Sequence, residues 1–168
     1  MTGKHSLAII ILILGPCVLI SYYFALKSNV HGIDALWGNM PDRLKALYPI
    51  GMVVATFGFL PFGYYSTFKS PSPAKYIPGF LLILIPSIIW LPLTVSYLNE
   101  ASSLKWQLIR VVLFIVPLGA SLVYWRLKAE HDDSFLKRLS IIALVGFILH
   151  TLILDAIVWP RYFHLLQF

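Results

Sequence analysis

Five apolar stretches, each about as long as a bilayer is thick, occupy most of the 168 residues of this chain. A helix needs about 20 predominantly apolar residues to cross the hydrocarbon core of a membrane. The sequence therefore predicts an all-α integral membrane protein, in which five transmembrane helices form a compact bundle and residues 1–168 make up a single transmembrane domain. The predicted spans cover residues 6–26, 48–68, 76–97, 106–125 and 138–159.

The composition agrees with this class, since 59% of the residues are hydrophobic and only 12% are charged. Soluble domains carry about twice that charged fraction. The formal net charge of +6 comes from Lys and Arg residues that lie mainly at the borders of the spans. Basic side chains at such borders meet lipid phosphates and set the orientation of the helices. We therefore expect membrane lipid as a partner, and no nucleic acid.

An odd number of spans places the two termini on opposite sides of the membrane. Seven basic residues at or beyond the borders of the spans fall on the N-terminal side and five on the other. The positive-inside rule then predicts a cytoplasmic N-terminus in an unspecified membrane. The seven are Lys4, Lys69, Lys75, Arg126, Lys128, Lys137 and Arg138, and the five are Lys27, Arg43, Lys45, Lys105 and Arg161.

The first span follows Lys4 and could be mistaken for a signal peptide. Its apolar run continues to Leu26 without a small-residue cleavage pattern, so we expect a retained helix. Cys17 is the only cysteine and lies inside this span. A disulfide framework and a cysteine-based metal site are therefore excluded within one chain.

Proline is frequent inside the predicted spans, beyond the first turn of each helix. An internal proline removes a backbone hydrogen bond and tends to kink its helix, so several proline-kinked spans are expected. Kinked helices that splay apart could leave a cavity, although proline is in any case more common in membrane helices than in soluble ones. Two of these prolines bracket Trp90 in the middle of a span. The five are Pro16, Pro61, Pro86, Pro92 and Pro117.

Apart from Arg138 at the first position of the last span, Arg110 and Asp155 are the full charges within the spans. Each lies four residues, about 6 Å along a helix, from a tryptophan at the membrane border. Both borders are on the C-terminal side, so the two charges lie at nearly the same depth and are predicted to pair. Alternatively, Arg110 snorkels to the lipid headgroups, or the pair only joins two helices.

Polar and aromatic residues at a similar depth suggest a cavity that opens toward the C-terminal side. The Gly-rich connection of residues 27–46, which contains Trp37, lies on the same face and could act as a lid. The residues predicted to line this cavity as a ligand-binding site are Tyr23, Trp90, Thr94, Arg110, Thr151 and Asp155.

His150 is the only histidine within a span and is a further candidate for the ligand-binding site. It could contact a ligand, relay a proton or hydrogen-bond a neighbouring helix. Five residues separate it from Asp155, which in an α-helix is about 140° of rotation, so the two are not expected to form a dyad. A metal site would need partners that the spans do not offer. The sequence identifies no cofactor.

The chain carries no nucleophile elbow, paired-histidine zinc motif, phosphate-binding loop or CxxC pair. The preferred hypothesis is a non-catalytic membrane protein that binds a hydrophobic or amphipathic small molecule in a pocket on the C-terminal side. One alternative is an accessory or structural subunit of a larger membrane complex. Another is a lipid-modifying enzyme, or a small transporter that acts as an oligomer. In size and span count the chain is similar to the tryptophan-rich sensory proteins of membranes, but it does not reproduce their Trp- and Pro-rich signatures, so no site is carried over.

Overall fold

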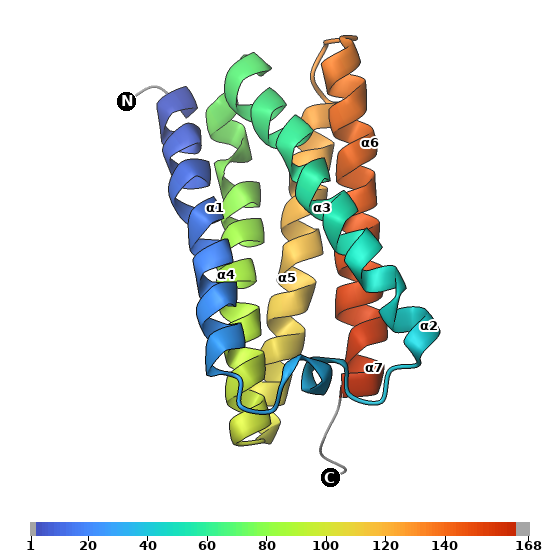
Figure 1. The fold of residues 1–168 in the computed structure, drawn as a ribbon. Coiled ribbons are helices and arrows are strands. Elements are labelled where there is room, and N and C mark those ends of the chain that lie inside the picture. The colour runs from blue at the N-terminus through green and yellow to red at the C-terminus, as the bar shows by residue number, and fades with distance from the viewer. Residues whose placement is uncertain (1–2, 164–168) are drawn as a thin grey trace.

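A computed structural model of the chain describes residues 3–163 and shows a bundle of long helices (Figure 1). Five helical segments are long and apolar enough to cross a membrane. They contain the five predicted spans and extend a few residues beyond most of them. The segments are Gly3–Ser28, Asp42–Lys69, Pro73–Asn99, Ser103–Lys128 and Phe135–Phe163.

Short 3-10 and π-helical pieces interrupt or join these segments. In chain order the elements are α1 (Gly3–Ser28), η1 (Ile33–Trp37), α2 (Asp42–Lys45), α3 (Leu47–Tyr64), η2 (Tyr65–Lys69), η3 (Pro73–Tyr76), α4 (Ile77–Asn99), α5 (Ser103–Lys128), α6 (Phe135–Leu149), η4 (His150–Val158) and α7 (Trp159–Phe163).

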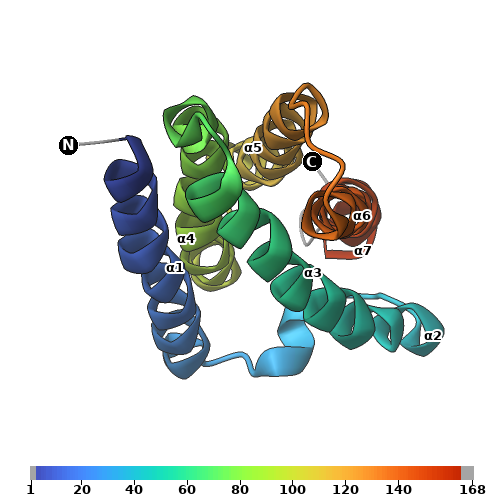
Figure 2. The same cartoon turned by 90° about the horizontal axis from the view of Figure 1, so that it is seen from above.

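The helices are not packed equally on one another. α4 contacts both α1 and α5, whereas α3 packs mainly on α6. Seen from above, α3 runs obliquely across the bundle, from the end where α4 begins toward α6 and α7 (Figure 2). The start of α1 and the end of α7 lie at opposite ends of the bundle (Figure 1). This placement of the two ends agrees with an odd number of spans.

Local sequence signals explain several helix boundaries. Ser102 and Ser134 are N-caps, whose hydroxyl oxygens accept hydrogen bonds from the backbone N–H groups of Lys105 and Lys137 at 3.3 Å. Such caps satisfy N–H groups that a helix start leaves without partners. The five prolines singled out from the sequence all lie inside helices.

The interface between α4 and α5 depends on two glycines. A Cβ atom at Gly119 would lie 2.8 Å from the carbonyl oxygen of Gly79, and one at Gly79 would lie 2.6 Å from a methyl group of Val123. Both distances are shorter than a van der Waals contact. Small residues let membrane helices approach closely, and these two set the distance between α4 and α5.

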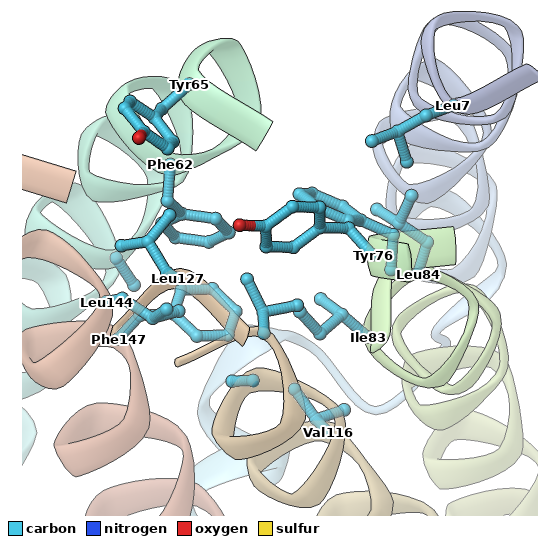
Figure 3. Packing of buried hydrophobic residues seen from close by; sticks show 14 residues of the cluster. Leu7, Phe62, Tyr65, Tyr76, Ile83, Leu84, Val116, Leu127, Leu144 and Phe147 are labelled. Carbon is cyan, nitrogen blue, oxygen red and sulfur yellow. The ribbon is translucent and has the colours of Figure 1, made fainter. Parts of the chain in front are cut away.

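Buried side chains form two main clusters, one toward each end of the bundle. In the cluster nearer the N-terminal end, side chains from α1, α3, α4, α5 and α6 meet (Figure 3). The Phe62 ring lies 5.7 Å from that of Phe147 and 6.0 Å from that of Phe80. The cluster at the other end is richer in tryptophan and contains Trp159, Tyr97 and Phe163. The candidate site lies next to this second cluster.

Candidate functional site

The helix that carries His150 and Asp155 changes from α to π geometry at His150. In the π segment the hydrogen bonds join residues five apart; the N–H of Trp159, for example, bonds to the carbonyl of Leu154. Residues five apart therefore lie above one another. His150 Nε2 is 3.6 Å from Asp155 Oδ2. The expectation that these residues do not form a dyad is wrong, because it assumed the rotation of an α-helix.

Pro160 gives a physical reason for a change of helix geometry at this place. Proline has no N–H and its ring collides with the carbonyl four residues earlier in a continuous α-helix. The π segment ends directly before α7, so that Pro160 lies in the first turn of a new helix, where proline is tolerated. The carbonyl of Leu154 also accepts a hydrogen bond of 2.7 Å from the hydroxyl group of Tyr48 in α3.

His150 is held between α3 and Asp155. Its side chain is only 8% exposed, and a Cβ atom at Gly51 of α3 would lie 2.5 Å from its Nδ1 atom. Only glycine at position 51 leaves room for the imidazole in this orientation. Within residues 3–163, Nδ1 has no hydrogen-bond partner. The ring is therefore placed by packing and by the contact of Nε2 with Asp155.

The carboxylate of Asp155 is partly accessible although it lies within a helical segment of the bundle. Its side chain is 29% accessible, although protein occupies much of the surrounding volume. The carboxylate interacts electrostatically with the phenol groups of Tyr22 in α1 and Tyr48 in α3. None of the described residues donates a hydrogen bond to its oxygens. The site is thus a carboxylate and an imidazole between two tyrosines from other helices.

Aromatic rings from several helices pack together near this pair, at the same end of the bundle. The indole N–H of Trp90 in α4 donates a hydrogen bond to the hydroxyl oxygen of Tyr22. The ring of Trp90 also meets that of Trp159 edge to face at 5.8 Å, and Trp159 stacks on Phe163 at 4.1 Å. This set of rings links α1, α4 and α7. Trp90 faces the interior of the bundle, as the sequence predicted.

The first connection closes this end of the bundle. The indole N–H of Trp159 donates a hydrogen bond of 2.8 Å to the carbonyl of Leu36, and the backbone N–H of Asn39 donates one of 3.0 Å to that of Tyr162. Gly38 lies between these contacts with a φ of 54°, and a Cβ atom there would come within 2.2 Å of the Tyr162 carbonyl. The connection lies at the end of the bundle where the sequence placed a lid.

The residues predicted to line the site are only partly brought together. Trp90, His150 and Asp155 lie in one region of the interior. Thr94 and Thr151 are buried, but their hydroxyl groups donate hydrogen bonds to backbone carbonyls one turn earlier in their own helices, at 2.8 and 2.9 Å. A threonine bonded in this way contributes its methyl group to the packing and keeps its hydroxyl proton within its own helix.

Two predicted residues lie outside the bundle interior. Tyr23 is 61% exposed and Arg110 is also exposed, so neither side chain belongs to the interior site. The predicted pair of Arg110 with Asp155 is wrong for the described residues, in which Asp155 contacts the imidazole of His150 and Arg110 is exposed. Matched depth in the membrane was not sufficient, because the rotation of α5 turns Arg110 outward.

The sequence interpretation missed three residues of the site: Tyr22, Tyr48 and Gly51. Tyr22 directly precedes the predicted Tyr23, and one residue along a helix is a rotation of about 100°. The choice between the two tyrosines depends on how α1 packs against α4. Gly51 gave no signal of its own, because its role comes from an imidazole on a distant segment.

A second polar cluster, formed around Glu130, joins two turns at the opposite end of the bundle. The Glu130 carboxylate accepts hydrogen bonds from the hydroxyl groups of Tyr76 at 2.7 Å and Ser70 at 2.5 Å, and at 3.1 Å it shares the single hydroxyl proton of Tyr65 with Asp132. The buried Lys137 ammonium donates to the Glu130 backbone carbonyl at 2.5 Å. The cluster therefore ties the η2–η3 turn to the turn between α5 and α6.

Asp132 extends this cluster toward the solvent. Hydrogen bonds from the side chain of Ser134 at 2.7 Å, the hydroxyl of Tyr65 at 2.8 Å and the backbone N–H of Ser134 at 2.9 Å lower the pKa of its carboxyl group. Each bond stabilises the charged form. The sequence suggested only a solvated turn with a helix cap here.

Other parts of the surface and the comparisons add no assignment. A hollow of about 480 Å³ lies between α1 and α4 and includes Ser21, Phe24, Pro92 and Asn99 in its lining, away from Asp155. Residues 3–163 contain no group of three His, Cys, Asp or Glu side chains that could hold a metal ion. The chain matches no protein-family model, no curated protein and no solved structure.

Proposed function

We propose that this protein crosses a membrane five times and holds a small amphipathic molecule beside Asp155, toward the C-terminal side of the bundle. Membrane insertion is supported by the outward faces of the helices. Large apolar side chains are exposed along all five segments, among them Leu12, Phe57, Ile85, Leu118 and Ile142. Exposure of these side chains is unfavourable in water, whereas the lipid tails of a membrane would cover them.

The observation that carries the binding proposal is the partly accessible carboxylate of Asp155, on a segment whose neighbouring residues belong to the tryptophan-rich cluster. A polar group in such a place is costly unless it has a partner. Ionisable groups at membrane depth commonly face a cavity and mark a functional site. A ligand with one polar group and a flat apolar body would satisfy both the carboxylate and the partly accessible ring of Trp90.

The alternative of an accessory subunit is supported by a different observation. Only Leu7 and Ala25 are buried in the 26 residues of α1, so this helix packs on the rest of the bundle over a narrow strip. A helix of a larger complex could cover its free face. On this alternative, the protein purified alone would aggregate and would carry no specific small molecule.

Purification in mild detergent, followed by mass spectrometry of the bound small molecules, tests the binding proposal. We expect a monodisperse protein that retains an amphipathic molecule. Trp90→Ala should reduce its retention, because Trp90 lies beside Tyr22 and Trp159 at the site. Trp125→Ala is the matched control, since Trp125 is 64% exposed near the opposite end of the bundle. Equal retention by both variants would contradict a site beside α4.

A further inference from the structure

We infer that the ligand of the Asp155 site is a lipophilic amine, bound as its ammonium cation. This inference rests on the proposed function and adds the chemical class of the ligand. The structural features that lead to it are the carboxylate of Asp155, the absence of a Lys or Arg partner for it among the described residues, and the aromatic rings of Tyr22, Trp90 and Trp159.

The charge of the site favours a cation. Within residues 3–163, Asp155 contacts the imidazole of His150, which is charged only when protonated, and this contact reaches only one carboxylate oxygen, Oδ2, at 3.6 Å. Oδ1 receives no hydrogen bond from the described residues. Arg110, the basic residue at matching depth, is exposed on the outside of the bundle. An ammonium group could donate hydrogen bonds to Oδ1 and balance the charge of the carboxylate.

The aromatic surroundings favour the same class. Tyr22 of α1 interacts electrostatically with Asp155, Trp90 of α4 donates a hydrogen bond to Tyr22, and Trp159 lies against Trp90 at 5.8 Å. An ammonium ion over an indole or phenol face is attracted by the ring quadrupole, and this attraction increases when the site excludes water. The Tyr22 oxygen already accepts the Trp90 N–H, so this pair holds the two rings in a fixed relation.

The same features disfavour an anionic ligand such as a fatty acid. A second carboxylate beside Asp155 would bring two negative charges together in a medium of low dielectric constant. Neither Lys nor Arg in the described part of the chain contacts the site to offset them. A neutral alcohol would fit the apolar walls but would lack the ionic interaction with Asp155.

Three probes with one ring and different head groups test the inference. They are 4-bromobenzylamine, 4-bromobenzyl alcohol and 4-bromobenzoate, added at pH 7 to the protein in phosphatidylcholine nanodiscs. Bromine quenches nearby tryptophans, and a Trp125→Phe background removes the signal from the distant end. We expect the amine to bind about tenfold more tightly than the alcohol, and the benzoate to bind least.

Asp155→Asn should remove the preference for the amine by lowering the affinity for the amine about tenfold. Glu100→Gln is the matched control, because it removes an exposed negative charge at the same end of the bundle and should keep the preference. If all three probes bind equally in both variants, the amine class is wrong and the amphipathic pocket remains. If none quenches the wild-type protein, the pocket itself is wrong. A monodisperse elution and a helical circular-dichroism spectrum equal to that of the wild type show that Asp155→Asn is folded.

Discussion

Gly51 is the residue on which the geometry of the site most directly depends. Its missing side chain provides the space for the His150 ring, because a Cβ atom would come within 2.5 Å of Nδ1. Gly51→Ala should therefore displace the imidazole or push α3 away from η4. We expect a loss of about 1 to 3 kcal/mol in the free energy of unfolding, as for other overpacked interiors. Thermal unfolding in detergent would measure it.

Gly15 in α1 is the control for this change. Nothing lies within 4 Å of a Cβ atom added there, and alanine is a better helix former than glycine. Gly15→Ala should be neutral or stabilising by up to about 1 kcal/mol. If Gly51→Ala were equally harmless, the close approach of α3 to His150 would not exist in solution.

The contact between His150 and Asp155 can be measured with a double-mutant cycle. His150→Phe, Asp155→Leu and the double variant should give a coupling energy of about 0.5 to 3 kcal/mol, as expected for residues in contact. The same cycle with Arg110→Leu and Asp155→Leu should be additive within about 0.5 kcal/mol. Coupling in the second cycle and additivity in the first would restore the pair predicted from membrane depth.

These residues also show what sequence reasoning can resolve. The importance of Asp155, His150 and Trp90 could be predicted, since a charge, an imidazole and a mid-span indole are each unusual within apolar spans. The residues that contact them could not be predicted. Tyr22 and Tyr23 are equivalent in chemistry and differ only in rotation about α1, which is decided by packing against α4.

At the scale of elements, the π segment η4 was the main feature that the sequence did not predict. Pro160 signals a helix disruption, but not whether the chain kinks, starts a new helix or widens into π geometry. The choice depends on contacts from other segments, such as the hydrogen bond from Tyr48 to the Leu154 carbonyl. The hydrophobic pattern is the same in all three cases.

The cluster around Glu130 fixes two turns to each other, and Tyr76 tests its strength. Tyr76→Phe removes a 2.7 Å hydrogen bond to a carboxylate in a nearly fully buried position. We expect a loss of about 1.5 to 3 kcal/mol in unfolding free energy, since the acceptor is charged. Tyr64→Phe is the control and should change stability by less than about 0.5 kcal/mol, because Tyr64 is half exposed. Equal effects would contradict the bond to Glu130.

The same cluster predicts a dependence of stability on pH. The pKa of Asp132 is lower in the folded protein than its ordinary value of about 4, because Ser134 and Tyr65 donate hydrogen bonds to its carboxylate. Its contribution to stability is therefore present above pH 4 and is lost as the pH falls through the lowered pKa. The unfolding temperature of Asp132→Asn should therefore differ less between pH 3 and pH 5 than that of the wild type does. Tyr65→Phe should reduce the wild-type difference in part.

At the scale of the whole molecule, the five helical segments could be predicted because each is an apolar stretch of the length that crossing a bilayer would require. The order of the helices in space could not, since their outer faces are almost uniformly apolar and give no periodic pattern to orient them. The position of α3 against α6 and away from α1 depends on small residues. It also depends on contacts between turns, such as those of the Glu130 cluster. Interior polar residues were therefore identified more reliably than their neighbours.

Cysteine labelling can test the arrangement of the whole chain across a membrane. The structure places the connection after α1 at one end of the bundle, beside Trp159, and the turn between α5 and α6 at the other, beside Tyr65. If the helices span a bilayer, these two segments lie on opposite sides. In a Cys17→Ser background, Val30→Cys and Asp133→Cys add one exposed thiol to each segment.

The basic residues at the borders predict which segment faces outward. Because seven lie on the N-terminal side and five on the other, the turn that contains Asp133 should be cytoplasmic. An impermeant maleimide added to intact cells should label Val30→Cys and should reach Asp133→Cys only after lysis. The opposite pattern would reverse the orientation and keep the five spans. Labelling of both thiols, or of neither, in intact cells would contradict five spans, since an odd number of crossings between residues 30 and 133 requires opposite sides.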